Sequence, residues 1–477
     1  MTLVKRIFRN TKILFFSNVI SKTFGFLYTI YMARYLGTES FGIISFALAL
    51  TGMFSVFLDM GTYSLTIREV ARDTSLTEKY LGNSIAIKLI LSIFTFLLIL
   101  GMTNIMGYPK ETTYVIYILF IYTIFSAYNN IFYSIYQAHE KMAYFGVGGL
   151  INSFLIFLST MVGVYCNAPM YYFAYAYLFS NIFVFIYNMV ITNLNFTKIN
   201  FFADFSFWKD FLKNAWPFAL SGIFVTIYFW MDSIMISYFI DESSVGLYSA
   251  AYRLVYVLLF IPSVYFSTMY PILSKKYRDS GAVKLIYGRS LKYFAILGVF
   301  MGSLTTLFSE NIISLIYGNE FMGSAIALKI LIWATAFSFL AHSTLYTLNS
   351  INKPLIYTKI TAFSAILNIV LNFMIIPTYG YVGASMTTLM TEFLGFLAMF
   401  LYLKNHLNEK IKDYGWFLNL IYITIFSVFA YVLAINKFQI SGLALFAFML
   451  CYAFGIIFRV FDNTDIDIFK KMLVAKK

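Results

Sequence analysis

The chain has 477 residues, of which 61% are hydrophobic and only 12% charged, and its mean hydropathy is +0.78. An ordinary soluble chain is nearer half apolar and a quarter charged, so this composition excludes a soluble globular protein and indicates a polytopic helical membrane protein. The net charge of +13 does not indicate nucleic-acid binding, because no basic face lies outside the membrane-spanning pattern. Cys166 and Cys451 lie in or beside apolar runs and make no disulfide framework.

The apolar runs predict about fourteen membrane-spanning helices, since a helix needs about 20 mostly apolar residues to cross a bilayer. Short, turn-like links join them, and none could hold a soluble domain. The basic N-terminal stretch has no cleavage site after the first apolar run, so we interpret it as a cytoplasmic tail and not as a signal peptide. The approximate centres of the spans are Phe24, Met53, Ser92, Ile124, Phe154, Ile182, Thr226, Leu259, Leu297, Phe337, Ile366, Leu394, Thr424 and Leu450.

The link Ala33–Gly42, between the first two spans, has the residues of a tight helical hairpin. Its Gly37 can take the positive φ that a sharp reversal needs. The segment Tyr238–Ala251 repeats the pattern, and Gly42 then matches Gly246 at an offset of 204 residues. We interpret this as one hairpin used twice, although chance recurrence of short glycine–serine turns is the alternative.

The repeat also predicts how the chain is divided. The second hairpin begins six spans after the first, so the two halves keep the same orientation and are related by a pseudo-two-fold axis along the membrane normal. We expect an N-lobe with spans 1–6 at residues 1–196 and a C-lobe with spans 7–12 at residues 197–410. Residues 411–477 are expected to form spans 13 and 14 and a cytoplasmic tail. Transporters built in this way bind substrate between the halves near the midplane.

Lysine and arginine are distributed unequally between alternate links. Nearly all the Lys and Arg residues outside the spans lie in the two termini and in the links after even-numbered spans. The links after odd-numbered spans hold only Arg34, Lys110 and Lys437. The positive-inside rule therefore predicts that both termini are cytoplasmic. Binding of anionic lipid headgroups is a secondary interpretation of the same cations.

Six ionisable residues fall inside predicted spans. A charge at a helix centre costs about 2.5–3.5 kcal/mol on insertion scales, so such residues usually face the bundle interior or a water-filled cavity. The six are Lys22, Lys88, Asp232, Arg253, Lys329 and Glu392. Two further ionisable residues lie near span ends, Asp59 at the inner end of span two and Lys292 at the inner start of span nine.

Several of these residues have a purely structural alternative. Lys88 is about two turns from the inner end of its span, so its ammonium could snorkel to the interface. Asp232 and Arg253 could pair as a structural bridge. Lys22 and Glu392 lie near mid-span and are the hardest to explain by structure alone.

Two polar positions in the first span have their own alternatives. Asn18 belongs to a set of asparagines that punctuate the spans, most of which we expect to form interhelical hydrogen bonds, while some could line a sugar path. Arg34 ends the span and is better explained as an anchor of the hairpin and of lipid headgroups than as a ligand.

The hairpin motif carries a resemblance to a known family. ARxLGxxxFG at Ala33–Gly42 resembles the polysaccharide-biosynthesis flippases of the multidrug/oligosaccharidyl-lipid/polysaccharide exporter superfamily. NAWPFALSG (214–222) and VGLYSAAYRL (245–254) resemble the start of that family's second lobe, and IYGNEF (316–321) and LNFMIIPTYGYVGAS (371–385) its later signatures. The resemblance covers most of the chain and implies a two-lobed core of twelve helices with two extra helices, alternating access and no nucleotide hydrolysis.

From this resemblance we expect a flippase for lipid-linked oligosaccharides, with membrane lipids and polysaccharide assembly proteins as further partners. A cavity lined by Lys and Arg would attract the phosphate or diphosphate of such a substrate. The substrate-binding set is Lys22, Lys88, Arg253 and Asn18. Asp232 and Glu392 are hypothetical coupling sites for H⁺ or Na⁺. The residues expected at the hairpin motif or a gate are Arg34, Gly37, Gly42, Asp59 and Gly246.

Three other functions are weighed against the flippase. A drug–cation antiporter of the same superfamily would want an acidic cavity, which the excess of Lys and Arg inside the spans disfavours. A flippase for the peptidoglycan lipid precursor shares the cationic chemistry and is separated less well. A membrane glycosyltransferase would need a large acidic outside loop, which the chain lacks. With no GxxxxGK[ST] loop and no cluster of metal ligands, we expect no catalytic residues, cofactor or metal.

Overall fold

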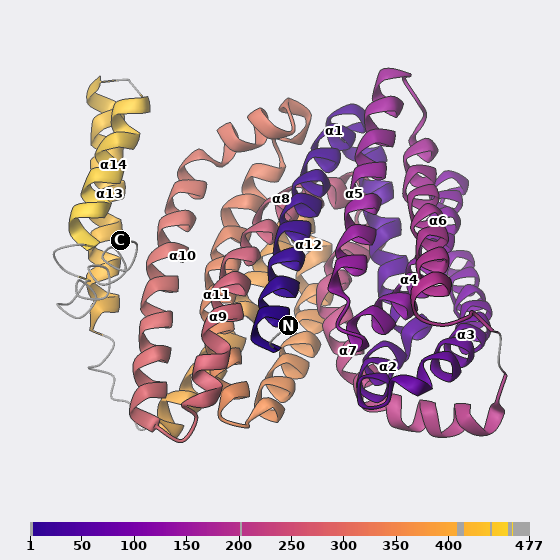
Figure 1. The fold of residues 1–477 in the computed structure, drawn as a ribbon. Helices are drawn as coiled ribbons and strands as arrows, with labels where there is room; N and C mark the ends of the chain where they lie inside the picture. The colour runs from indigo at the N-terminus through magenta and orange to yellow at the C-terminus, as the bar shows by residue number, and fades with distance from the viewer. Residues whose placement is uncertain (1–2, 201–202, 408–414, 439–440, 457–459, 461–477) are drawn as a thin grey trace. The chain divides into compact units, whose positions relative to one another are not determined.

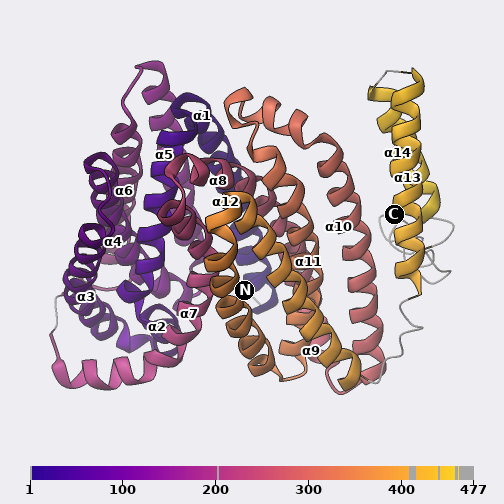
Figure 2. The same cartoon turned by 180° about the vertical axis from the view of Figure 1, so that it is seen from behind.

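The computed structural model describes residues 3–200, 203–407, 415–438, 441–456 and 460, and every regular element in these ranges is a helix (Figures 1 and 2). Ten stretches are long and apolar enough to cross a membrane, which agrees with the predicted all-α polytopic membrane protein. The elements are α1 (Leu3–Asp59), α2 (Thr62–Arg72), η1 (Thr74–Leu76), α3 (Thr77–Met106), α4 (Lys110–Ala138), α5 (Met142–Tyr165), α6 (Met170–Asn195), α7 (Phe205–Phe239), α8 (Glu242–Tyr256), η2 (Val257–Leu259), α9 (Phe260–Lys275), α10 (Ser280–Ile316), η3 (Asn319–Phe321), α11 (Ser324–Ser350), α12 (Pro354–His406), α13 (Trp416–Phe438) and α14 (Ser441–Gly455).

The helices α1 and α12 are too long to be single spans. They contain 57 and 53 residues, which at 1.5 Å per residue is about 80 Å each, against about 30 Å for the bilayer core. Each is broken at one glycine with a positive φ, Gly37 (+73°) and Gly380 (+56°). The predicted positive φ at Gly37 is therefore confirmed, and Gly380 is the corresponding break in α12.

Thirteen of the fourteen predicted span centres lie in α-helices, and the remaining one, Leu259, lies in the 3₁₀ turn η2. Pro262 explains this exception. Its nitrogen cannot donate to the carbonyl of Leu258 four residues earlier, and its ring crowds that carbonyl, so the helix tightens locally between α8 and α9.

The chain divides into two compact units. Unit 1 comprises Met1–Ala250, Ile313–Ser324 and Ala365–Ala384. Unit 2 comprises Ala251–Ile312, Ala325–Ser364 and Ser385–Lys477. The lobe boundaries expected at residues 196/197 and 410/411 stay predictions.

In unit 1, α1 packs against α3, α4, α5 and α7. A ladder of amides joins α4, α5 and α6, in which Asn188 donates to Asn129 (2.9 Å), Asn129 to Asn181 (2.9 Å) and Asn181 to Asn152 (3.2 Å). These bonds confirm the predicted interhelical role for three of the span asparagines, because a polar side chain at membrane depth must find its partner within the protein.

Unit 2 is held by an aromatic core. The ring of Phe266 in α9 stacks on Tyr346 of α11 at 4.6 Å and lies 5.8 Å from Phe294 of α10. The helices α13 and α14 pack against each other, and the Tyr452 hydroxyl of α14 donates to the Ile296 carbonyl of α10 at 2.8 Å.

Candidate functional site

The hairpin at Gly37 is fixed by two oppositely charged side chains. Arg34 donates from Nε to the Ile316 carbonyl (2.7 Å) and from Nη2 to the Leu315 carbonyl, at the end of α10. Cationic donors stabilise the exposed carbonyls of a helix C-terminus. These contacts support the interpretation of Arg34 as a hairpin anchor.

Glu320 performs the converse role at the start of the second part of α1. Its Oε1 accepts from the Thr38 backbone N–H (2.7 Å) and the Thr38 hydroxyl (3.3 Å), where a carboxylate complements a helix N-terminus. Sequence reasoning did not single out Glu320. The sequence pattern that could have identified it is the IYGNEF stretch, which carries part of the family resemblance and contains Glu320.

The two hairpins of the repeat meet at their glycines. A Cβ added at Gly42 would overlap the Glu242 carbonyl, and one added at Gly246 would overlap the Thr38 carbonyl. Both positions therefore require glycine for backbone contact between α1 and α8.

Asp59 and Lys88, predicted for different roles, form one ion pair. The Lys88 ammonium lies 3.1 Å from Asp59 Oδ1 and donates to the Leu58 carbonyl at 3.1 Å. The Lys88 side chain is 1% exposed and that of Asp59 is 33% exposed. Asp59 also accepts from Thr62 and Tyr63 at the start of α2. The pair therefore joins α3 to the corner between α1 and α2, and part of the Lys88 charge is already compensated.

Asn18 and Lys22 lie one turn apart on the first part of α1, and both are exposed in the structure. The neighbouring face of the helix is occupied, since the ring of Phe24 packs against Phe154 (5.5 Å) and Phe157 (5.3 Å) of α5. The predicted pair of substrate ligands thus shares a face of α1 that α5 does not cover.

Asp232 is the centre of a buried polar cluster in unit 1. Its side chain is 5% exposed. Oδ2 accepts from the Tyr248 hydroxyl and Oδ1 from the Asn372 amide, both at 2.6 Å, and Asn372 also donates to Asn368 at 3.0 Å. The cluster therefore joins α7, α8 and α12 through one carboxylate.

Glu392 of unit 2 is half-buried and accepts from the Ser338 hydroxyl at 2.6 Å. One turn along α11, His342 Nδ1 lies 2.7 Å from the Ser338 carbonyl. A carbonyl oxygen can only accept, so Nδ1 carries the proton and Nε2 of the neutral ring remains an acceptor. His342 was not singled out from the sequence, because its spacing from Glu392 gives no signal.

The other ionisable residues of the spans in unit 2 have separate surroundings. Lys329 pairs with Glu310 at 2.9 Å, with both side chains more than a third exposed. Arg253 is half-buried in the last turn of α8, and Lys292 is 6% exposed in α10. Within the described residues, no group of three His, Cys, Asp or Glu is placed to hold a metal ion.

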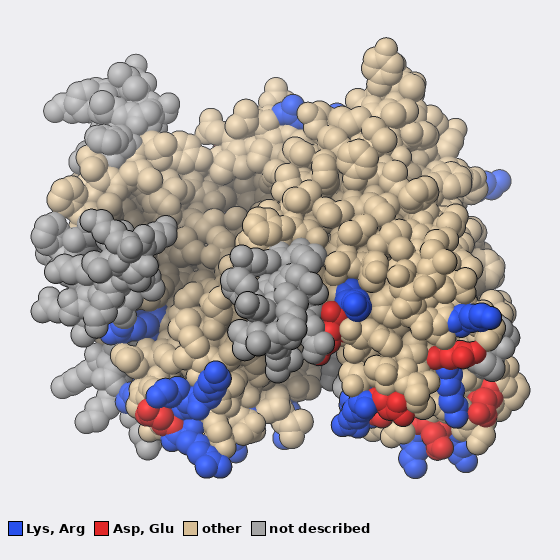
Figure 3. Space-filling model, in the orientation of Figure 1, with Lys and Arg blue, Asp and Glu red and all other residues tan. Residues whose placement is uncertain are grey.

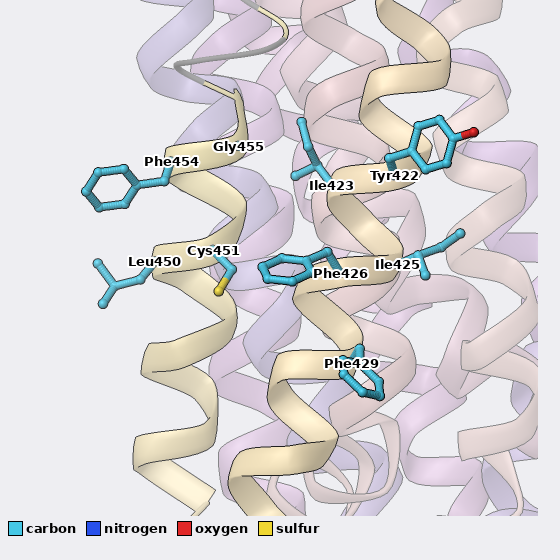
Figure 4. Close-up of a pocket in the computed structure, with 9 residues that line it drawn as sticks. All are labelled: Tyr422, Ile423, Ile425, Phe426, Phe429, Leu450, Cys451, Phe454 and Gly455. Carbon is cyan, nitrogen blue, oxygen red and sulfur yellow. The ribbon is translucent and has the colours of Figure 1, made fainter.

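An apolar cavity of about 850 Å³ lies between α13 and α14 (Figure 4). Cys451 points into the space between the two helices, towards Phe426. Apart from the Cys451 thiol and the Tyr422 hydroxyl, the side chains are hydrocarbon. The lining residues are Tyr422, Ile423, Ile425, Phe426, Phe429, Leu450, Cys451, Phe454 and Gly455.

Comparison with known proteins gives two matching family models. The model described as polysaccharide biosynthesis protein matches residues 7–277, and the MatE model matches residues 217–374.

Curated relatives and a solved structure are also similar to this chain. The capsular polysaccharide biosynthesis protein CapF of Staphylococcus aureus is 24% identical over 83% of this chain and 99% of its own. The probable flippase AglR of Haloferax volcanii is 23% identical over 81% of each. The lipid II flippase MurJ in an inward closed conformation has the same fold, with a TM-score of 0.76 at 17% identity over 94% of this chain and 98% of that one.

Proposed function

Because the chain belongs to the polysaccharide biosynthesis protein family, we propose that it is a flippase that moves lipid-linked oligosaccharides across the cytoplasmic membrane. The lipid would carry the sugar on a phosphate or diphosphate, and the lobes would expose the site alternately to the two sides. We propose no catalytic role for any residue, so the substrate would leave chemically unchanged.

The observation that carries this proposal is the exposed pair Asn18 and Lys22 on α1. A lysine at membrane depth costs free energy unless it faces water or an anion. An amide and an ammonium one turn apart suit a sugar hydroxyl next to a phosphate. Lys88 is the weaker ligand, since Asp59 already lies beside it. Arg253 of α8 is the remaining cation of the proposed set.

The proposed topology has fourteen spans. Counting α1 and α12 as two spans each, on either side of Gly37 and Gly380, and adding α13 and α14, gives this number. We place both termini in the cytoplasm, spans 1–6 in an N-lobe (1–196) and spans 7–12 in a C-lobe (197–410). The cavity between α13 and α14 is the proposed place for the hydrocarbon chain of the lipid, because its lining is almost entirely apolar.

Two carboxylates are proposed for ion coupling. Asp232 accepts hydrogen bonds from the Tyr248 hydroxyl and the Asn372 amide, which hold the carboxylate that would take up H⁺ or lie beside Na⁺. Glu392 is joined through Ser338 to His342, so this site contains two groups that can hold a proton.

The second candidate function is a cation-coupled drug antiporter. The MatE match at residues 217–374 favours it. In such an antiporter, Asp232 and Glu392 would select the transported cation, and Lys22 would not be needed. A peptidoglycan-precursor flippase is the third candidate and would share the need for Lys22.

The test uses the purified full chain in liposomes that carry a fluorescent polyprenyl-diphosphate oligosaccharide on one leaflet. We expect its transfer to the other leaflet without new chemical linkages. Lys22→Ala combined with Arg253→Ala should abolish transfer, whereas Lys329→Gln, at an exposed ion pair, should not. Normal transfer by the double variant would refute the cationic site. Export of ethidium without lipid transfer would assign the chain to the antiporters, and transfer of lipid II alone to the precursor flippases.

A further inference from the structure

The segment Ile313–Ser324 belongs to unit 1, although the chain on both sides of it belongs to unit 2. It contains the end of α10, the turn η3 and the first residue of α11. Continuity of the chain therefore does not hold this segment in unit 1, and contacts with other parts of the unit must do so. Four hydrogen bonds join it to the Gly37 hairpin, at the end of unit 1 that the proposed topology places outside the cell.

Two charged side chains make these four hydrogen bonds. Arg34 of the hairpin donates to the carbonyls of Leu315 and Ile316. Glu320 of the segment accepts from the N–H and the hydroxyl of Thr38. Both charged side chains are exposed. Because water can take the place of either charge at an exposed helix end, bonds of this kind contribute little net free energy and can break and form again.

Thr38 brings a third segment into the same contact. Its Oγ1 accepts from the hydroxyl of Ser243 at 3.1 Å, at the start of α8 and within the second hairpin of the repeat. The rings of Phe41 and Phe321 also join the hairpin to the segment, with centroids 5.9 Å apart and both residues fully buried. Separation of the segment from the hairpin would therefore break one buried ring contact and a few exposed hydrogen bonds.

Charged side chains are sparse at this end of unit 1 on the face that Figure 3 shows. Few blue or red atoms lie at the upper end of α1, whereas Lys, Arg, Asp and Glu gather below α2 and the start of α7. That face therefore offers few other charges that could replace Arg34 or Glu320. Asp232 of the same unit shows the contrasting design, because its carboxylate is 5% exposed and ties three helices together away from water. A permanent joint gains from such burial, whereas exposed bonds to helix ends suit a contact that opens and closes.

We propose that Arg34, Thr38, Ser243 and Glu320 form an outer latch. In the present conformation the outer latch holds the segment Ile313–Ser324 against the Gly37 hairpin and closes this end of unit 1. It opens when the lipid-linked substrate leaves towards the outer side, and water then takes over the bonds of the two charges. This inference rests on the proposed function, of which it describes the release step.

The first experiment measures how often the outer latch opens. Ser45, one turn after Gly42 in α1, is 4% exposed. A cysteine in its place should react with a bulky hydrophilic maleimide only when the surrounding helices separate. The Ser45→Cys reporter is placed in the full chain with both native cysteines changed to serine, and its labelling rate is measured in detergent.

Glu320→Gln and Arg34→Gln should each raise this labelling rate by about two- to fivefold, since each removes one charge from a helix end. Lys110→Gln is the matched control, because Lys110 is an exposed cation at the start of α4, and it should leave the rate unchanged. Equal rates in the unaltered chain and in both latch variants would overturn the outer latch. An equal rise in Lys110→Gln would also overturn it.

A reversible cross-link covers the case in which these variants do not fold. Thr38→Cys combined with Ser243→Cys, in the chain without native cysteines, places two thiols where two hydroxyls now share a hydrogen bond. Oxidation of this pair should stop lipid transfer in liposomes, and reduction should restore it. Equal transfer by the oxidised and reduced protein would overturn the outer latch and leave the flippase standing. Absence of transfer by the unaltered chain would refute the proposed function, while the labelling rates would still confirm or overturn the latch.

Discussion

Gly42 and Gly246 are in reciprocal backbone contact. The space beside Gly42 is filled by the carbonyl of Glu242, and the space beside Gly246 by the carbonyl of Thr38. Thr38 and Glu242 are separated by the same 204 residues as the two glycines. The contact is therefore the same when the two repeats are exchanged, as a local two-fold axis requires. This geometry supports a true repeat over chance recurrence of a turn.

Either glycine should be intolerant of a side chain. Gly42→Ala places a methyl group on the Glu242 carbonyl, and Gly246→Ala places one on the Thr38 carbonyl, so the backbones must separate. We expect each change to lower the free energy of unfolding by about 1–3 kcal/mol, as overpacking does. Gly101→Ala in α3, which meets no atom within 4 Å, is the matched control. Thermal unfolding in detergent is the measurement, and a stable Gly42→Ala protein would contradict the close crossing.

The Asp59–Lys88 pair should respond asymmetrically to removal of either partner. Asp59→Asn leaves an ammonium that is 1% exposed and still donates to the Leu58 carbonyl, whereas Lys88→Met leaves a carboxylate that is one-third exposed. We therefore expect Asp59→Asn to be the more destabilising change, by about 3 kcal/mol. The double variant should recover part of that loss. Thermal unfolding of the unaltered protein and the three variants completes a double-mutant cycle. A larger loss of stability for Lys88→Met would show that burial of the ammonium does not hold the pair together.

The contrast between these two sites shows what sequence could predict. The hairpin could be predicted because a glycine in a turn-like link and a repeated motif are local sequence patterns. These patterns identify Gly37, Gly42 and Gly246. The partner of Lys88 could not be predicted, since Asp59 lies 29 residues away on another helix. The spacing of side chains within one span does not tell which helices pack beside it. Hydropathy located the spans for the same local reason.

The clusters around the other intramembrane carboxylates could not be predicted from the sequence for a related reason. Asp232 meets Asn372 across 140 residues, and Glu392 meets Ser338 across 54. Burial forces each carboxylate to find donors, but many serines and asparagines in the spans could have supplied them. Only the packing of the helices selects the partners.

The two carboxylates should separate proton from sodium coupling. Glu392→Gln keeps the size of the side chain but removes the carboxylate that accepts from the Ser338 hydroxyl, one turn from His342. We expect it to lose the stimulation of lipid transfer by a pH gradient while slow transfer without a gradient remains. His342→Asn should reduce the same stimulation, and Ser338→Ala should act in the same direction. Transfer in liposomes with imposed pH or Na⁺ gradients is the measurement. Stimulation that follows Na⁺ and disappears only in Asp232→Asn would assign coupling to the other cluster.

The two native cysteines can report the membrane topology without introduced cysteines. Cys166 is exposed in the link between α5 and α6, and Cys451 lines the apolar cavity between α13 and α14. With both termini in the cytoplasm, an impermeant maleimide added to intact cells should label Cys166. It should not reach Cys451, which a membrane-soluble maleimide should label. Cys166→Ser is the control for specificity. Labelling of Cys166 only after the membrane is opened would invert the proposed orientation.

His139, in the link between α4 and α5, should make the stability of this corner depend on pH. Burial, and secondarily the charge of Lys141, lower its pKa below the usual 6.5, while its Nε2 lies 2.9 Å from the Thr77 hydroxyl. That hydroxyl donates to the Thr74 carbonyl, so it accepts from the neutral ring. The unfolded chain therefore binds a proton more readily than the folded one.

The stability that His139 contributes is then fully present above pH 6.5 and is lost as the pH falls below that value. We expect the unfolding temperature in detergent to fall between pH 7 and pH 5, and His139→Gln to flatten that part of the profile by removing the titrating group. The exposed His406 at the end of α12 provides the control, since His406→Gln should leave the profile unchanged. A profile that flattens equally in both variants, or that rises towards acid, would mean that His139 does not control this corner.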